Sequence, residues 1–142
     1  MEFLYEQELR DYFWSLYGYR KTIEAYRFET ARRGGMDLAT LERVRNRFEF
    51  CAFEFKLNDM KRVITQAKHN MQYVHKSFIV IPDTKEKLIR DKYWLEIVNQ
   101  KYLGVITVEH EGRWNIIHQP RTQPDELITL NQSLLSLFDL RK

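Results

Sequence analysis

Apolar residues recur along this chain at two spacings, which separate the expected helices from the expected strands. Spacings of three to four residues are typical of a helix with one buried face, and they occur in two segments: 2–17 and 58–75. Three other segments are rich in aromatic and β-branched residues and are expected to be strands: 19–28, 36–42 and 48–55. Gly18 is expected to end the first helix, and Asn58 or Asp59 to cap the second. The first half of the chain therefore predicts the order α-β-β-β-α.

The second half continues with strands and helices in alternation. The uninterrupted apolar run Ser77–Ile81 is typical of a strand covered on both faces. Pro82-Asp83-Thr84 is expected to open a helix that Gly104 ends, and segments 103–108 and 114–118 to form a hairpin. A last helix is expected from Pro124-Asp125, with its apolar face formed by Leu127, Leu130, Leu134, Leu137 and Phe138. The order α-β-β-β-α-β-α-β-β-α predicts an α/β fold with a mixed central sheet flanked by helices.

Composition narrows the class of protein. The chain has 142 residues, of which 44% are hydrophobic, so one domain covering 1–142 with a substantial core is expected. No apolar run approaches the roughly 20 residues of a membrane span, and the first residues lack the pattern of a secretion signal. Cys51 is the single cysteine, which excludes an internal disulfide. A cytoplasmic protein without a membrane partner is expected.

The net charge of +3 matters less than the place of the basic residues. Five arginines gather between positions 32 and 47: Arg32, Arg33, Arg43, Arg45 and Arg47. Such a cluster indicates contact with phosphate or nucleic acid, although basic surface loops are equally common on ordinary proteins. If it binds nucleic acid, the loops that carry the arginines are expected to form a rim close to any site in the neighbouring strands.

The segment Cys51–Lys56 is the one whose charges need an explanation. Glu54 and Lys56 would lie on the same face of an otherwise apolar, interior strand. Burying charge costs free energy unless the charge is paired or binds a metal. Two other acid-any-Lys triplets begin at Asp59 and Asp83, where helix capping explains the acid. Glu54 and Lys56 therefore form either a structural ion pair or part of a site.

Asp37 favours a site. It begins the preceding strand, and a hairpin turning near residue 45 would set it beside Glu54. Two converging carboxylates can hold a hard divalent cation such as Mg²⁺, and a nearby lysine can orient or deprotonate an attacking water. These are the groups that phosphodiester hydrolysis requires.

At these residues the sequence resembles the PD-(D/E)XK, or restriction-endonuclease-like, nuclease superfamily, over roughly residues 2–120. The resemblance implies Asp37 and Glu54 as ligands of Mg²⁺ or Mn²⁺, the Phe55 carbonyl as a further ligand, and Lys56 as the catalytic lysine. It also implies a glutamate from the first helix, for which Glu6 is preferred over Glu8. Gln66 corresponds to a glutamine that some branches place near the site. Met36 stands where the family has proline, and Asn70 where those branches have tyrosine.

The expected function is that of a metal-dependent nuclease acting on DNA or on RNA, with DNA preferred. The alternative is a catalytically inactive nuclease-fold module that binds nucleic acid or a protein partner. An unrelated α/β interaction module would leave Asp37, Glu54 and Lys56 scattered. A homodimer or a targeting partner is compatible with each. Four histidines show no ligand spacing and are expected at the surface or in loops: His69, His75, His110 and His118.

Overall fold

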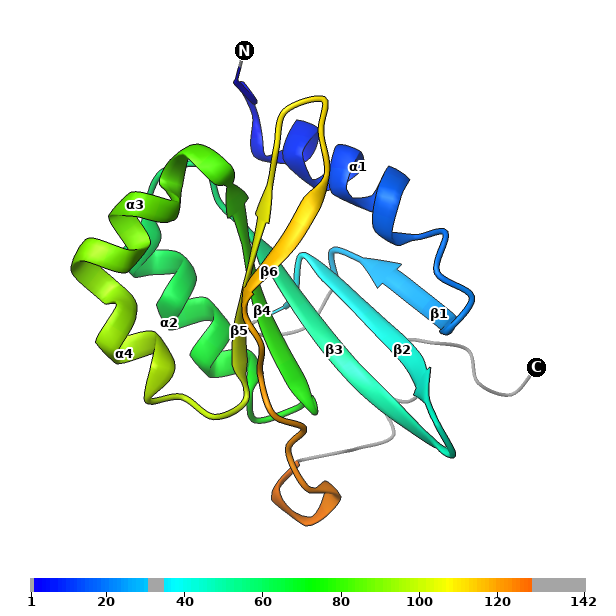
Figure 1. The fold of residues 1–142 in the computed structure, drawn as a ribbon. Helices are drawn as coiled ribbons and strands as arrows, with labels where there is room; N and C mark the ends of the chain where they lie inside the picture. Colours follow the sequence, from blue (N-terminus) through cyan, green and yellow to red (C-terminus); the bar gives the residue numbers. More distant parts are fainter. Residues whose placement is uncertain (1, 31–34, 129–142) are drawn as a thin grey trace.

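A computed structural model of the chain describes residues 2–30 and 35–128 and contains a six-stranded mixed sheet with helices on both faces (Figure 1). The strands lie in chain order, with the bounds Ile23–Phe28 (β1), Leu38–Val44 (β2), Arg47–Phe55 (β3), Lys76–Pro82 (β4), Leu103–Val108 (β5) and Trp114–His118 (β6). β1, β2 and β3 pair antiparallel, β3, β4 and β5 pair parallel, and β6 returns antiparallel to β5. The expected α/β class and the interior position of β3 are confirmed.

Two helices and one composite helical run connect these strands. The helices are α1 (Glu6–Tyr17) and α2 (Met60–Asn70). The run between β4 and β5 consists of a 3₁₀ turn η1 (Asp83–Lys85), α3 (Glu86–Leu88), a π-helical turn η2 (Ile89–Tyr93) and α4 (Trp94–Val98). A further 3₁₀ turn, η3 (Asp125–Leu127), follows β6. Asp59 caps α2, because its side chain accepts a hydrogen bond from the amide of Arg62 at 3.1 Å.

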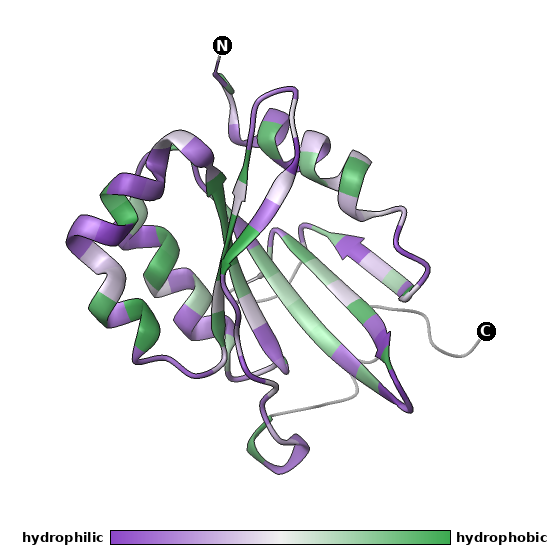
Figure 2. Cartoon of the chain, viewed as in Figure 1, coloured by the Kyte–Doolittle hydropathy of each residue, from purple (hydrophilic) through white to green (hydrophobic). Residues whose placement is uncertain are grey.

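The sheet separates two apolar cores, and the alternation of side chains along β4 shows how. Phe78 and Val80 pack with Leu9 and Phe13 of α1 on one face. Ile79 and Ile81 pack on the other face with four residues of α2: Met60, Val63, Ile64 and Ala67. The central strands are accordingly the most continuously hydrophobic part of the ribbon (Figure 2). The prediction of a strand covered on both faces is confirmed, and α1 and α2 lie on opposite sides of the sheet.

Several expected boundaries were wrong. The helical run ends at Val98, and Gly104 lies inside β5 opposite Phe78 instead of ending a helix. A Cβ atom at Gly104 would lie 2.6 Å from the Pro120 ring and 2.9 Å from the Phe78 ring, so close packing requires this glycine. Of the expected last helix, only η3 is described. The apolar positions Leu130, Leu134, Leu137 and Phe138 lie outside the described residues.

His75, expected at the surface or in a loop, lies in the loop before β4 and is buried. His75 is 4% exposed, and its Nδ1 accepts a hydrogen bond from the amide of Phe50 at 2.8 Å. This contact assigns the ring proton to Nε2, which donates to Asp125 Oδ1 at 2.6 Å. The segment after β6 is also held by Gln123, whose side-chain Nε2 donates a hydrogen bond to the carbonyl of Met71 at 2.6 Å. The sequence did not indicate this burial, because the partners of the ring come from β3 and from the segment after β6, which are distant in sequence.

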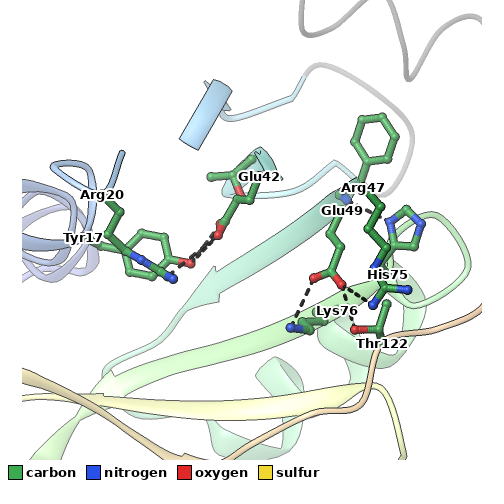
Figure 3. Close-up of polar contacts among 10 residues, drawn as sticks. Tyr17, Arg20, Glu42, Arg47, Glu49, His75, Lys76 and Thr122 are labelled. Carbon is green, nitrogen blue, oxygen red and sulfur yellow. Dashed lines mark hydrogen bonds and ion pairs between the residues drawn. The ribbon is translucent and has the colours of Figure 1, made fainter. Parts of the chain in front are cut away.

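Two glutamates of the sheet are buried with hydrogen-bond donors around them (Figure 3). Glu42 is 5% exposed and accepts hydrogen bonds from the hydroxyls of Tyr17 and Thr40, while Arg20 lies 3.7 Å away. Burial, and then the charge of Glu42, raise the pKa of Tyr17 far above its usual range, so this phenol stays protonated and donates to the carboxylate.

The second buried glutamate, Glu49, is 1% exposed and has two cations beside it. Its carboxylate contacts Arg47 Nη2 at 2.9 Å, Lys76 Nζ at 3.2 Å and the Thr122 hydroxyl at 2.8 Å. Burial raises the pKa of Glu49, but the Thr122 hydrogen bond, Lys76 and Arg47 outweigh it and hold the pKa below its ordinary value of 4.5. Glu49 thus joins β3 and β4 to the segment after β6.

Membrane insertion of a helix finds no support in the fold. Within residues 2–30 and 35–128, none of the helices combines the length and apolarity needed to cross a bilayer.

We predict that Glu49→Gln lowers the free energy of unfolding by about 1–3 kcal/mol at neutral pH, because bonds to a charged acceptor are lost. The wild-type carboxylate binds its proton at lower pH when folded than when unfolded, so its contribution is present above pH 4.5 and is lost as the pH falls below. Urea unfolding at a series of pH values should show the two proteins converging in acid. Exposed Glu126→Gln is the control, and an unchanged difference across the series would contradict the prediction.

Candidate functional site

The β2–β3 hairpin brings together the two acids that the sequence singled out. Leu38 pairs with Phe53, so Asp37, one residue before β2, lies opposite Glu54. The amide of Asp37 approaches Glu54 Oε2 at 3.4 Å, and the amide of Phe55 donates to Asp37 Oδ2 at 3.0 Å. The expected juxtaposition of the two carboxyl groups is confirmed. The turn of the hairpin lies at the other end of the two strands. The contact between Asp37 and Glu54 therefore depends on the register of the strands and not on the turn.

Glu54 is held in an environment that disfavours its charge. It is 2% exposed, and its Oε2 accepts a hydrogen bond from Asn70 Nδ2 at 2.8 Å. Burial, followed by the negative charge of Asp37, raises the pKa of Glu54 to about 8. Asn70 and the Asp37 amide act in the opposite direction but do not outweigh these effects. Without a bound cation, Glu54 therefore carries a proton over most of the neutral range.

The contrast with the other buried glutamates of the sheet is informative. Glu42 has Arg20 near its carboxylate, and Glu49 has Lys76 and Arg47. Among the residues that the structure describes, no cationic side chain forms an ion pair with Glu54, whose close charged neighbour is another acid. Within the described residues, the protein provides cations to its other buried acids but none to this pair, so the pair retains a proton, which a bound cation could replace.

Lys56 and Glu6 lie at the same edge of the sheet. Lys56 is the first residue after β3, and its Nζ lies 3.6 Å from Glu6 Oε1 in the first turn of α1. The alternation expected to place Lys56 on the face of Glu54 ends with the strand at Phe55, and the ammonium contacts the helix that covers the opposite face. The Lys56 side chain is 18% exposed, which leaves its end accessible from this edge.

A small pocket of about 140 Å³ opens beside these groups. Its walls are formed by Glu6, Gln7, Arg10, Glu29, Asp37 and Phe55. Glu54 does not belong to this lining, so its carboxyl group lies behind Asp37 and the Phe55 backbone. Three of the six lining residues are acidic and one is basic. Arg10 lies 3.7 Å from Glu29 and Lys56 lies 3.6 Å from Glu6, so Asp37 is the lining acid without an ion pair among the described residues.

On α2, the side chain that reaches the acids is Asn70 and not Gln66. Gln66 is one helical turn earlier, half-buried, and its Oε1 is enclosed without a hydrogen-bond partner among the described residues. Asn70 is 1% exposed and donates to Glu54. The sequence could have indicated Asn70, because the four-residue spacing places positions 66 and 70 on one helix face.

Three of the five arginines of the predicted rim, Arg43, Arg45 and Arg47, are not close to this site. Arg43 and Arg47 are near the closed end of the β2–β3 hairpin, where Arg45 occupies the turn with a φ of 58°. Arg43 pairs with Glu24, and Arg47 with Glu49. The expectation failed because residues at a hairpin turn are a full strand length from residues at its open end. Arg32 and Arg33 lie outside the described residues.

The donor set suits a hard divalent cation. Asp37 and Glu54 supply carboxylate oxygens, and the Phe55 backbone, which contacts Asp37, supplies a carbonyl oxygen. Across residues 2–30 and 35–128 there is no group of three or more histidine, cysteine or acidic side chains placed to hold a metal. Backbone and water oxygens would therefore complete the coordination, as is common for Mg²⁺.

Comparison with known proteins adds no family to this description: no protein-family model and no curated protein sequence matches the chain.

We predict that Glu54→Gln makes the metal-free protein more stable in alkaline solution. The folded carboxyl group has a pKa of about 8 and the unfolded one about 4.5, so wild-type stability falls as the pH rises between these values. Glutamine keeps an acceptor for Asn70 and cannot ionise, so this loss should disappear. Thermal unfolding at several pH values, with chelator present, should show the variant gaining on wild type from pH 5 to pH 9. A variant less stable at every pH would contradict the assignment.

Proposed function

We propose that this protein hydrolyses phosphodiester bonds of nucleic acid in a reaction that depends on Mg²⁺ or Mn²⁺. The observation that carries the proposal is the contact between Asp37 and Glu54 at the open end of the hairpin, beside the Phe55 backbone. Two acids, a backbone carbonyl and a lysine two residues after the second acid form the pattern of the PD-(D/E)XK nucleases. The order of elements from α1 to β4 also agrees with that resemblance.

Each residue has a distinct role in this proposal. A bound divalent cation would polarise the phosphodiester and lower the pKa of an attacking water. Asp37 and Glu54 would hold it through carboxylate oxygens, and Phe55 through its carbonyl oxygen. Lys56 would orient the water and donate hydrogen bonds to the negative charge that develops on the phosphate. Glu6, which lines the pocket and lies 3.6 Å from the ammonium, would hold Lys56 beside it.

The position of Asn70 supports a site more than a purely structural acid pair. Its hydrogen bond fixes one oxygen of Glu54 and leaves the carboxyl group oriented toward β2. Ligand carboxylates are usually oriented by such neighbours, which hold them ready for the metal. Asn70 would therefore position Glu54 without touching substrate.

One observation favours the second candidate function, an inactive nuclease-fold module that binds nucleic acid or a protein partner. Glu54 is 2% exposed, and Asp37 already accepts a hydrogen bond from Phe55. In this case Asp37 and Glu54 would only stabilise the hairpin, and the surface around Lys56 would bind the partner without catalysis.

We predict that the purified protein cuts DNA or RNA in Mg²⁺ or Mn²⁺ and that chelator abolishes the cleavage. Asp37→Ala and Glu54→Gln should each remove a ligand, and calorimetric titration should show weaker Mn²⁺ binding for both. Lys56→Ala should retain Mn²⁺ binding while the rate of cleavage falls by roughly 10²-fold or more, since a proton-transfer or water-orienting group is lost.

The matched control is Lys92→Ala, which removes an exposed lysine from the helical run between β4 and β5. It should leave both cleavage and Mn²⁺ binding unchanged. If no substrate is cut, or if Lys56→Ala cuts as fast as wild type, the catalytic role fails and the inactive module takes its place.

A further inference from the structure

A second pocket, of about 220 Å³, lies at the same edge of the sheet as Asp37. It is bounded by the segment before α1, the residues after β3, the start of η1 and His110 after β5. β3, β4 and β5 are parallel neighbours, so the pocket lies at their carboxyl ends. Open α/β sheets bind their ligands at such ends, because the chain leaves the strands there in loops.

The lining of this pocket is mainly polar, with a smaller apolar part from Phe3, Leu4, Leu57 and Pro82. Phe3 is 8% exposed, and its ring packs edge-to-face against His110 with centroids 5.0 Å apart. His110 Nδ1 is enclosed without a hydrogen-bond partner among the described residues, since Glu111 Oε1, 4.0 Å away, is beyond bonding distance. A ligand would bond this nitrogen only if the ring turned toward the pocket. The accessible lining suits a small group that forms several hydrogen bonds and covers a limited apolar surface.

The rim of the pocket is polar but nearly balanced in charge. Glu2 and Asp83 oppose Lys85, while Asn58 and Thr84 offer both donors and acceptors. A phosphate would meet two carboxylates here, which makes the pocket a poor site for a polyanion. A neutral group with donors and acceptors on its edge, such as a nucleobase, matches this rim.

The two pockets are close enough for one nucleic acid strand to reach both. Leu57 and Asn58 follow Phe55 by two and three residues, and Leu4 precedes Glu6 by two. Two residues of extended chain span about 6.6 Å, so the pockets are neighbours along the edge. Lys56, which pairs with Glu6, is the residue between Phe55 of one pocket and Leu57 of the other.

We propose that this pocket receives an unpaired base of the strand whose phosphate lies beside Asp37. The substrate class is then single-stranded or locally unpaired nucleic acid, because a base inside a duplex cannot leave its stack without cost. The choice of ligand rests on the proposed function. The pocket itself, with its mainly polar lining, is independent of whether Asp37 and Glu54 support cleavage.

The experiment measures binding without catalysis. Fluorescence anisotropy, in chelator and without divalent metal, would compare a labelled twelve-residue thymidine strand, the same length of abasic strand, and a duplex. Wild type should bind the base-carrying strand about tenfold more tightly than the abasic strand, as expected for stacking of one base. Thr84→Trp, at an exposed position on the rim, should fill the pocket and bring this ratio close to one.

Controls separate a blocked pocket from a damaged fold. Thr65→Trp, at an exposed position on α2, should behave as wild type, and Asn58→Trp should reproduce Thr84→Trp from a different element. Circular dichroism would establish that each variant is folded. Equal wild-type affinity for base-carrying and abasic strands, or folded Thr84→Trp and Asn58→Trp variants that still discriminate, would overturn the base pocket.

The two proposals fail separately. Base discrimination without cleavage of any substrate in Mg²⁺ or Mn²⁺ would support the base pocket and refute the nuclease. Cleavage with equal affinity for base-carrying and abasic strands would refute the base pocket and support the nuclease.

Discussion

The free-energy cost of burying carboxylates constrains this structure more than any other single interaction. Glu42, Glu49 and Glu54 are all at most 5% exposed, and all belong to the two strands of one hairpin. The protein compensates Glu49 with Lys76 and Arg47, and Glu42 with hydroxyl groups and a more distant arginine. Glu54 instead meets Asp37. Because burial and Asp37 keep Glu54 protonated, this exception supports the cation site proposed above.

The topology explains why this exception is at an edge of the sheet. β3 is antiparallel to β2 and parallel to β4, so the carboxyl end of β3 is also the open end of the β2–β3 hairpin. Acids from two strands therefore meet where α1 begins and where the chain leaves the sheet toward α2. The start of α1 contributes Glu6 to one pocket and its preceding segment contributes Phe3 to the next. Two pockets with polar linings thus share one edge of the sheet.

Stability and proposed function act in opposite directions at Glu54. A carboxyl group with a pKa of about 8 makes the metal-free fold less stable as the pH rises, and an amide would remove this cost. The opposite end of the hairpin shows the reverse arrangement, because Glu49 gains from its partners and joins β3 to the segment after β6 through Thr122. One hairpin therefore combines a stabilising cluster at one end with a strained acid pair at the other, as functional sites in stable folds often do.

Local patterns in the sequence determined the elements and the acid pair. Apolar spacing predicted α1, α2 and the six strands, because burial of one face imposes that spacing, and the hairpin spacing predicted that Asp37 would face Glu54. Only the tertiary structure decided the partners. The register of the hairpin and contacts between distant segments place Asn70 on Glu54 and His75 against Phe50. They also separate Arg43, Arg45 and Arg47 from the acids. Residue spacing does not encode these contacts, because they arise only when the sheet and its covering helices pack together.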